Sequence, residues 1–289
     1  MPCCLKKNEP PSRSIRRLCR ERISLARGWL RKADRAPAIH NVRKEIKKIR
    51  AMLRLVKQEI LRRDYVKTTR ALQKVSGRLA PSRDARVMLW ELLKLTEKCS
   101  IKFPSTHEVL LKHCQRETRK FGKEKLPALT DRWLRKVSRR VGRLKINAKD
   151  WAMIETGLRR SLRRGRISFK LAGREPSSEN FHEWRKRVKD LWHHLQLICP
   201  KRPTDIRAFI DDLALLAEQL GEEHDLYLLS QFAKENSSAV EGRALNHLID
   251  ARQKKLRVAS LKLGAIVFKN SSSVVCHRLK CHWLGCGKN

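Results

Sequence analysis

The sequence predicts an all-α protein, and three observations lead to that class. Apolar residues recur at steps of three and four, as at Ile39, Val42, Ile46 and Ile49, which is the period of an amphipathic helix. No segment shows the apolar and polar alternation of a β-strand. Hydrophobic residues make up 41% of the 289 positions, so the chain can fill a core and is not expected to be disordered.

Capping residues and prolines predict where the helices start and stop. Residues 1–11 end in two prolines and are expected to form a flexible lead-in. Ser12 or Ser14 caps the first helix, Pro37 opens the second, and segment 105–108 resembles a capping box. The predicted helices, in order, are 12–32, 37–63, 66–79, 82–99, 105–121, 130–144, 148–170, 179–199, 206–220, 222–234 and 240–268.

Gly122 and Pro127 mark a joint near the middle of the chain. We therefore expect two helical halves, 12–124 and 125–268. A basic tail that contains cysteine and histidine follows at 269–289.

The second predicted helix carries a basic stripe beside its apolar one, about 100° round the helix. A similar pair of stripes returns 142 residues later. Each copy is followed by an Asp, which lies 44 residues after the first histidine and 43 after the second. Two signals at one offset indicate an internal duplication. The first basic stripe consists of His40, Arg43, Lys47, Arg50 and Arg54, the second of His182, Arg185 and Lys189, and the later elements are Arg83-Asp84 and His224-Asp225.

The net charge points to a polyanionic partner. The chain has 68 Lys and Arg against 29 Asp and Glu, a formal charge of +39. Such a surplus repels itself unless a polyanion neutralises it. Nucleic acid, an anionic membrane surface and a phosphate polymer are the candidates, and net charge alone does not rank them.

Cysteine usage and hydropathy predict a cytoplasmic protein. Nine cysteines without paired spacing argue against a secreted disulfide framework. No stretch approaches the roughly 18 consecutive apolar residues of a membrane span, and the N-terminus has no apolar signal core.

A Lys/Arg stripe is usually a solvated helix face. Here the basic stripe adjoins the apolar stripe and occurs twice. It also contains few acidic residues, since Glu45 and Asp190 lie off the stripe or are isolated. Concentrated cations at the margin of a core need an anion, and mixed Arg and Lys suit phosphoryl oxygens. One stripe spans roughly 20 Å, so two facing stripes could line a basic groove for a flexible linear polyanion.

At this point the residues resemble a known family. His-x-x-Arg-Lys occurs at 40–44 and again at 182–186, and Arg-Asp or His-Asp follows at 83–84 and 224–225. This four-part pattern looks like the CHAD family, the conserved histidine α-helical domain, over about residues 12–268. The resemblance implies two pseudo-symmetric four-helix bundles around a basic central cavity, which bind inorganic polyphosphate, often at polyphosphate granules.

The resemblance also implies a set of ligand residues and no cofactor. The second copy departs from the family pattern at Trp192-His193, where an Arg-Tyr pair would be usual. Trp192 cannot supply the missing charge, so the second half is expected to hold phosphate less strongly unless His193 or Arg187 compensates. The implied ligands are His40, Arg43, Lys44, Lys47 and Arg50 in the first half and His182, Arg185, Lys186 and Lys189 in the second.

Two roles are open for the acidic elements. In the first role Asp84 and Asp225 do not contact the phosphate but orient basic ligand residues, such as Arg83 and His224. In the second they are acidic residues that interact favourably with a helix N-terminus. The preferred role for both His40 and His182 is that of a hydrogen-bond donor to phosphate. Protonation of these histidines would then strengthen binding in mild acid.

The terminal segment carries Cys276, His277, Cys281, His282 and Cys286, which are soft metal ligands. Their spacing of five is not that of a zinc finger. A disordered basic tail is therefore preferred, and no metal site is predicted. Cys3 and Cys4 are either lipidation sites or without function.

Three functions follow from these observations, in order of preference. The first is non-catalytic binding of inorganic polyphosphate. The second is general polyanion or nucleic-acid binding, with nucleic acid as a competing partner. This function is disfavoured because the tryptophans lie at apolar helix positions rather than on an exposed stacking surface, as at Trp90, Trp133 and Trp184. The third is a polyphosphate or triphosphate hydrolase, which would need paired carboxylates beside the stripes.

Overall fold

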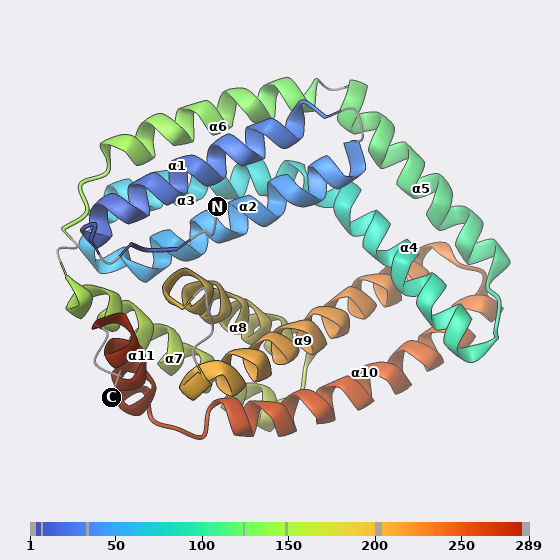
Figure 1. The fold of residues 1–289 in the computed structure, drawn as a ribbon. Helices are drawn as coiled ribbons and strands as arrows, with labels where there is room; N and C mark the ends of the chain where they lie inside the picture. The colour runs from blue at the N-terminus through green and yellow to red at the C-terminus, as the bar shows by residue number, and fades with distance from the viewer. Residues whose placement is uncertain are drawn as a thin grey trace.

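The computed structural model describes residues 4–6, 8–32, 35–123, 125–147, 150–199 and 204–284. Within these ranges the chain forms eleven α-helices and one short 3-10 helix, and the only strand-like pairing is an isolated bridge between Ile60 and Ile146 (Figure 1). The all-α prediction is confirmed. No helix in the described ranges is both long enough and apolar enough to cross a membrane.

The helices are numbered in chain order, and most bounds are close to those predicted, with exceptions at the end of α2, in α9 and at α11. They are α1 (Pro11–Leu30), α2 (Arg35–Leu55), η1 (Lys57–Glu59, the 3-10 helix), α3 (Arg62–Arg78), α4 (Ala80–Cys99), α5 (Pro104–Lys123), α6 (Leu126–Arg143), α7 (Trp151–Arg174), α8 (Ser178–Ile198), α9 (Thr204–Asn236), α10 (Ala239–Val267) and α11 (Ser272–Leu284).

The second helix ends at Leu55, not near residue 63 as predicted. Another helix causes the stop. Arg160 of α7 donates to the backbone oxygens of Arg54 and Leu55, which are among the carbonyls that a helix C-terminus leaves unpaired. Beyond η1 the backbone at Ile60 is extended, and α3 then starts in a new direction.

Segments 206–220 and 222–234 were predicted as two helices, and the structure joins them in α9. A glycine inside a helix costs about 1 kcal/mol relative to alanine. Packing at both ends of α9 outweighs this, because Leu213 and Leu216 lie in one apolar core and Leu226 and Leu229 in another.

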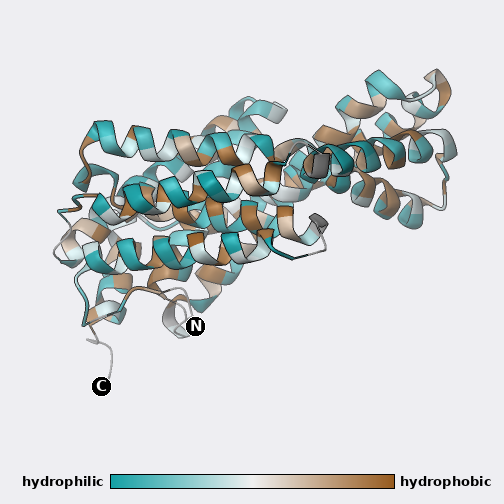
Figure 2. Cartoon of the chain, turned by 90° about the horizontal axis from the view of Figure 1, so that it is seen from above, coloured by the Kyte–Doolittle hydropathy of each residue, from teal (hydrophilic) through white to brown (hydrophobic). Residues whose placement is uncertain are grey.

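Each of the two apolar cores combines helices from early and late parts of the sequence. The larger one joins α1, α2, α3, α6, α7, α8, α11 and the first part of α9. The smaller one joins α4 and α5 to the second part of α9 and to α10. Figure 2 shows a broad body and a narrower arm of helices, and by comparison with Figure 1 the arm contains α4 and α5.

Part of the predicted tail is ordered as α11. Val275, Cys276 and Leu279 are buried, and the helix contacts α7. The preferred interpretation of a disordered tail is therefore wrong for residues 272–284. Cys286 and Cys3 lie outside the described residues.

The division at residue 125 stays a prediction. α6 begins just after that point, yet it contacts α1 and α3, both of which lie in the predicted first half. These contacts favour a division after α6 rather than before it.

Candidate functional site

Four helices from distant parts of the chain surround one pocket of about 460 Å³, which we call the central pocket. α2 contacts α4 and α8, and α9 contacts α4 and α8, so the four helices form a closed ring of neighbours. Gly221 of α9 lines the pocket; a Cβ there would lie 4.0 Å from Nε of Arg185, so this arginine packs closely along α9.

The central pocket collects residues from both basic stripes. α2 carries the first stripe and α8 the second, and their inward faces meet where the two helices pack. The predicted site residues that line the pocket are His40, Arg43, Lys44 and Lys47 from α2, Arg185, Lys189 and His193 from α8, Arg83 from α4 and Asp225 from α9.

The remaining predicted residues do not line the pocket. Arg54 forms an ion pair with Asp190 of α8, so the acid that the sequence pattern treated as isolated neutralises one end of the first stripe. Lys186 donates to Glu183 of its own helix at 3.3 Å. The full set outside the lining is Arg50, Arg54, Asp84, His182, Lys186 and His224.

Crowding of cations is strongest at Lys47. Its surroundings desolvate the ammonium group, and Arg185, Arg83 and Arg43 repel it, so the pKa of Lys47 falls to about 7. The side chain of Lys47 is exposed where it lines the central pocket, although many protein atoms surround it. Burial and Arg185 likewise lower the pKa of Lys189 to about 8. Lys47 and Lys189 thus lie among cations that repel them.

Several buried polar atoms around the pocket have no hydrogen-bond partner among the described residues. Nε of Arg43 and of Arg185 are two of them, and Nε1 of Trp192 and Nδ1 of His193 are two more. Nε of Arg50 and Nδ1 of His182 lie on the same two helices. Because buried polar groups are normally paired, these atoms mark a site with capacity for an acceptor-rich ligand.

The two predicted Asp elements hold arginines in place. Arg83 Nη1 donates to Asp84 at 3.1 Å and to Asp225 at 3.2 Å, and Arg43 lies 3.9 Å from Asp84. Arg43 also donates to the backbone oxygen of Ser76 at 2.7 Å. Asp225 lies inside α9, so the interpretation as a helix N-terminal acid is wrong for it, and the geometry supports a role in orienting Arg83.

Four histidines at or beside the pocket have lowered pKa values. The rings of His182 and His224 lie 4.0 Å apart. Burial and neighbouring cations lower the pKa of His182 to about 4, of His193 to about 3 and of His224 to about 2. Burial and Arg83 also lower the pKa of His40. The prediction that protonation near the usual pKa strengthens binding is therefore wrong for His182 in the free protein, and the pKa of His40 is shifted in the same direction.

One wall of the pocket is acidic, and of its residues the sequence analysis singled out Asp225 but missed Glu91, Glu218 and Glu222. Glu218, Glu222 and Asp225 share a face of α9 at spacings of four and three, and Glu91 of α4 lines the same pocket. Their helical spacing is visible in the sequence, but the position of α9 opposite the stripes is not. Glu222 pairs with Arg252 at 2.7 Å and Glu91 with Lys94 at 3.0 Å.

No metal site emerges from the described residues. No group of three or more His, Cys, Asp and Glu is close enough there to hold a metal ion. In α11, Cys281 Sγ lies 3.6 Å from Nε2 of His277, while Cys276 is buried and its pKa is raised to about 11 by burial. This pair does not extend to the set of ligands that zinc requires.

Two solved structures share this fold. The first is the crystal structure of the CHAD domain from the plant Ricinus communis, 15% identical, with a TM-score of 0.63 and coverage of 93% of this chain and 95% of that chain. The second is PptA from Streptomyces chartreusis, 14% identical, with a TM-score of 0.66 and coverage of 91% and 100%. At these identities the likeness concerns the fold alone.

The family is assigned from the sequence, by its match to a family model. A search among curated protein sequences finds no significant match. The family model of the CHAD domain matches residues 14–234, which include both striped helices and all four walls of the central pocket. The chain therefore belongs to the CHAD domain family.

Proposed function

We propose that the protein binds inorganic polyphosphate in the central pocket and does not alter it chemically. The observation that carries the proposal is the meeting of both basic stripes in one pocket, where burial and the repulsion of neighbouring arginines lower the pKa values of Lys47 and Lys189. An anion among these groups removes their mutual repulsion. Membership of the CHAD family supports the same ligand.

A linear phosphate chain suits this arrangement better than one small anion. The cations are spread along α2, α4 and α8 rather than gathered at one point. The arginines supply planar forks and the lysines supply mobile point charges, so successive phosphoryl oxygens of a repeating chain can be bound at once. α2 and α4 together contribute more Lys and Arg residues to the lining than α8 does, which supports the prediction that the first half binds phosphate more strongly.

Binding without hydrolysis is the second part of the proposal. Hydrolysis of phosphoanhydrides generally relies on carboxylates that hold divalent metal ions. Here three of the four acidic residues that line the pocket, Asp225, Glu222 and Glu91, are each paired with a basic side chain. We expect no phosphate release from polyphosphate with added Mg²⁺ or Mn²⁺. A cytoplasmic location, at polyphosphate granules, is part of the same proposal.

The test is a competition at physiological salt. Labelled polyphosphate is bound to the protein and then challenged with unlabelled polyphosphate, RNA or DNA at equal phosphate concentration. We expect polyphosphate to displace the label at the lowest concentration. Equal displacement by all three would replace the proposed site by general polyanion binding.

A further inference from the structure

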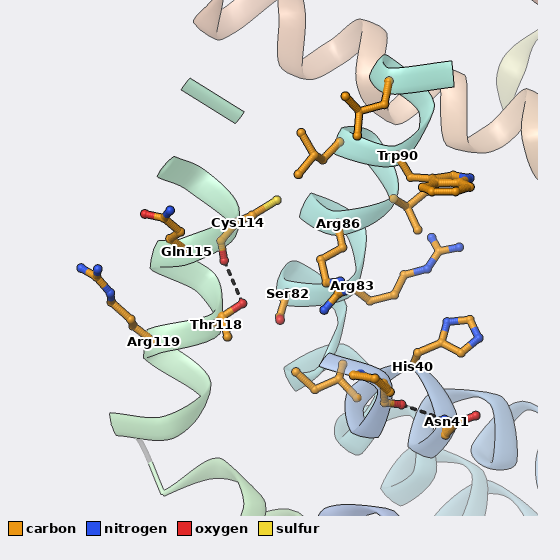
Figure 3. A pocket seen from close by; sticks show the side chains of 15 residues that line it. His40, Asn41, Ser82, Arg83, Arg86, Trp90, Cys114, Gln115, Thr118 and Arg119 are labelled. Atoms are coloured by element: carbon orange, nitrogen blue, oxygen red, sulfur yellow. Dashed lines mark hydrogen bonds between the residues drawn. The ribbon is translucent and has the colours of Figure 1, made fainter. Parts of the chain in front are cut away.

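A second pocket lies next to the central one, between α4, α5 and the start of α2, and encloses about 710 Å³ (Figure 3). We call it the side pocket. The proposed function uses only two of its lining residues, His40 and Arg83, which line both pockets. Its other residues have no role in holding a phosphate chain.

The lining of the side pocket combines cations with an apolar surface. Arg86 and Arg119 add to the charge of Arg83, and neither Asp nor Glu is among the lining residues. Val87 and Leu93 belong to the apolar part. A ligand that fits such a lining has an apolar or aromatic body and a negatively charged end.

An exposed tryptophan makes an aromatic body the better choice. Trp90 lines the side pocket and is 60% exposed, contrary to the expectation that it lies at a core position. A flat ring gains from stacking on an indole, and this contact tolerates any base because every base has a π-face. Figure 3 shows Trp90, Arg83 and His40 projecting from the same side of their helices.

Hydrogen-bonding groups in the pocket favour a heterocycle over a hydrocarbon chain. Ser82 is only 6% exposed, and its hydroxyl has no partner among the described residues. Gln115 and Asn41 also line the pocket, and Asn41 uses its Nδ2 to donate to the backbone oxygen of Pro37. A hydrocarbon chain offers no partner to these polar groups, whereas the edge of a nucleobase carries donors and acceptors that can pair with Gln115 and, after a small shift of the side chain, with the Ser82 hydroxyl.

The two pockets are connected by shared side chains. Arg83 and His40 stand between them. Lys94 lines the central pocket, and its Nζ lies 5.8 Å from the ring centre of Trp90. A ring stacked on this indole therefore lies within reach of the cations of the central pocket.

We propose that the side pocket binds the base of a nucleoside triphosphate whose phosphates extend past Arg83 and His40 into the central pocket. The inference rests on the proposed function in one respect, because the phosphates use the same cations as polyphosphate. It follows that a nucleoside triphosphate competes with polyphosphate and that its base contributes affinity of its own.

The test compares ATP with inorganic triphosphate by titration calorimetry on the full chain. Inorganic triphosphate measures the phosphate contacts alone. We expect ATP to bind about tenfold or more tightly than this control, the factor that corresponds to one stacked base. Replacement of Trp90 by Ala should reduce the affinity for ATP to that for triphosphate, and the affinity for triphosphate should not change.

Three further variants sharpen the result. Trp90→Phe keeps an aromatic ring and should retain most of the difference between ATP and triphosphate. Ser82→Ala should weaken ATP binding alone. Ile266→Ala is the matched control, since Ile266 is also 60% exposed but lies on α10 outside both pockets, and it should change nothing.

The outcomes separate this inference from the proposed function. Equal affinities of ATP and triphosphate for the unaltered protein would overturn the inference and leave the phosphate site intact. The same holds if Trp90→Ala weakens both ligands equally. Absence of binding by both triphosphate and polyphosphate would instead contradict the proposed function, on which the inference rests.

Discussion

At the scale of single residues, the main feature of the central pocket is electrostatic repulsion between its basic side chains. Lys47 faces Arg185, Arg83 and Arg43 within one pocket, and its pKa is lowered to about 7. Burial is the first cause of this shift and repulsion by the three arginines is the next, and an incoming anion offsets that repulsion. The histidines contribute as neutral hydrogen-bonding groups, because their pKa values lie well below neutrality.

Binding should therefore depend on the protonation of lysine. A bound anion raises the pKa values of Lys47 and Lys189, which are about 7 and 8 in the free protein, so binding takes up protons in this range. Affinity for polyphosphate should fall at least about tenfold as the pH rises from about 6.5 to 8.5. Calorimetry in buffers of different ionisation enthalpy measures the proton uptake directly.

The double variant Lys47→Arg, Lys189→Arg identifies the titrating groups. Arginine stays charged throughout this range, so the variant should bind polyphosphate with little dependence on pH. Lys48→Arg serves as the control, because Lys48 lies on the same helix, pairs with Glu45 at 3.0 Å and does not line the central pocket. An unchanged pH profile in the double variant would contradict the assignment.

At the scale of helices, close packing of α7 and α8 on α2 sets the position of the first stripe. His194 of α8 is buried, and its Nε2 lies 2.8 Å from the backbone oxygen of Ala51 while its Nδ1 lies 3.1 Å from the hydroxyl of Ser161. Gly157 of α7 allows the end of α2 to approach, since a Cβ there would lie 1.9 Å from the Leu55 oxygen. The end of α2 is thus fixed by contacts with two other helices.

Gly157→Ala should strongly destabilise the fold. The added methyl group meets backbone rather than a flexible side chain, so α7 has to move away from α2, at a cost of about 3 kcal/mol. Gly142→Ala in α6 is the matched control, because its Cβ would meet nothing within 4 Å, and it should be neutral or stabilising by up to about 1 kcal/mol. Chemical denaturation followed by circular dichroism measures both, and equal stabilities would contradict this packing.

Local spacing explains which parts of the fold and site are predictable from sequence. The all-α class, most helix bounds and the inward residues of the two stripes follow from periods of three and four. The stop of α2 at Leu55 and the continuity of α9 through Gly221 do not, because Arg160 and the two cores decide them.

The charge balance of the site also depends on how the helices are arranged. Asp190 neutralises Arg54 only because α8 packs on α2, and the acidic residues of α9 face the stripes only in the folded chain. Trp90 occupies an apolar position in its helix and is nevertheless 60% exposed, in the lining of the side pocket. Such features require the tertiary structure.

At the scale of the whole molecule, a net charge of +39 opposes the compact state. A polyanion that binds only the folded chain should stabilise it, by about 2.7 kcal/mol when its free concentration is 100 times the dissociation constant. Polyphosphate should raise the melting temperature at low salt and progressively less as salt is added, because bound counterions compete. Thermal scans across a salt series check this, and a rise that does not depend on salt would contradict it.

One comparison tests the central claim most directly. Arg43→Glu combined with Arg185→Glu reverses two charges in the central pocket, one from each stripe. Arg63→Glu combined with Arg116→Glu changes the net charge equally at exposed positions outside it. Circular dichroism establishes that both variants keep their helices before polyphosphate affinity is measured. We expect the pocket variant to bind at least about 100-fold more weakly and the control to bind nearly as the unaltered protein does. Equal losses in both variants would contradict a dedicated polyphosphate site in the central pocket.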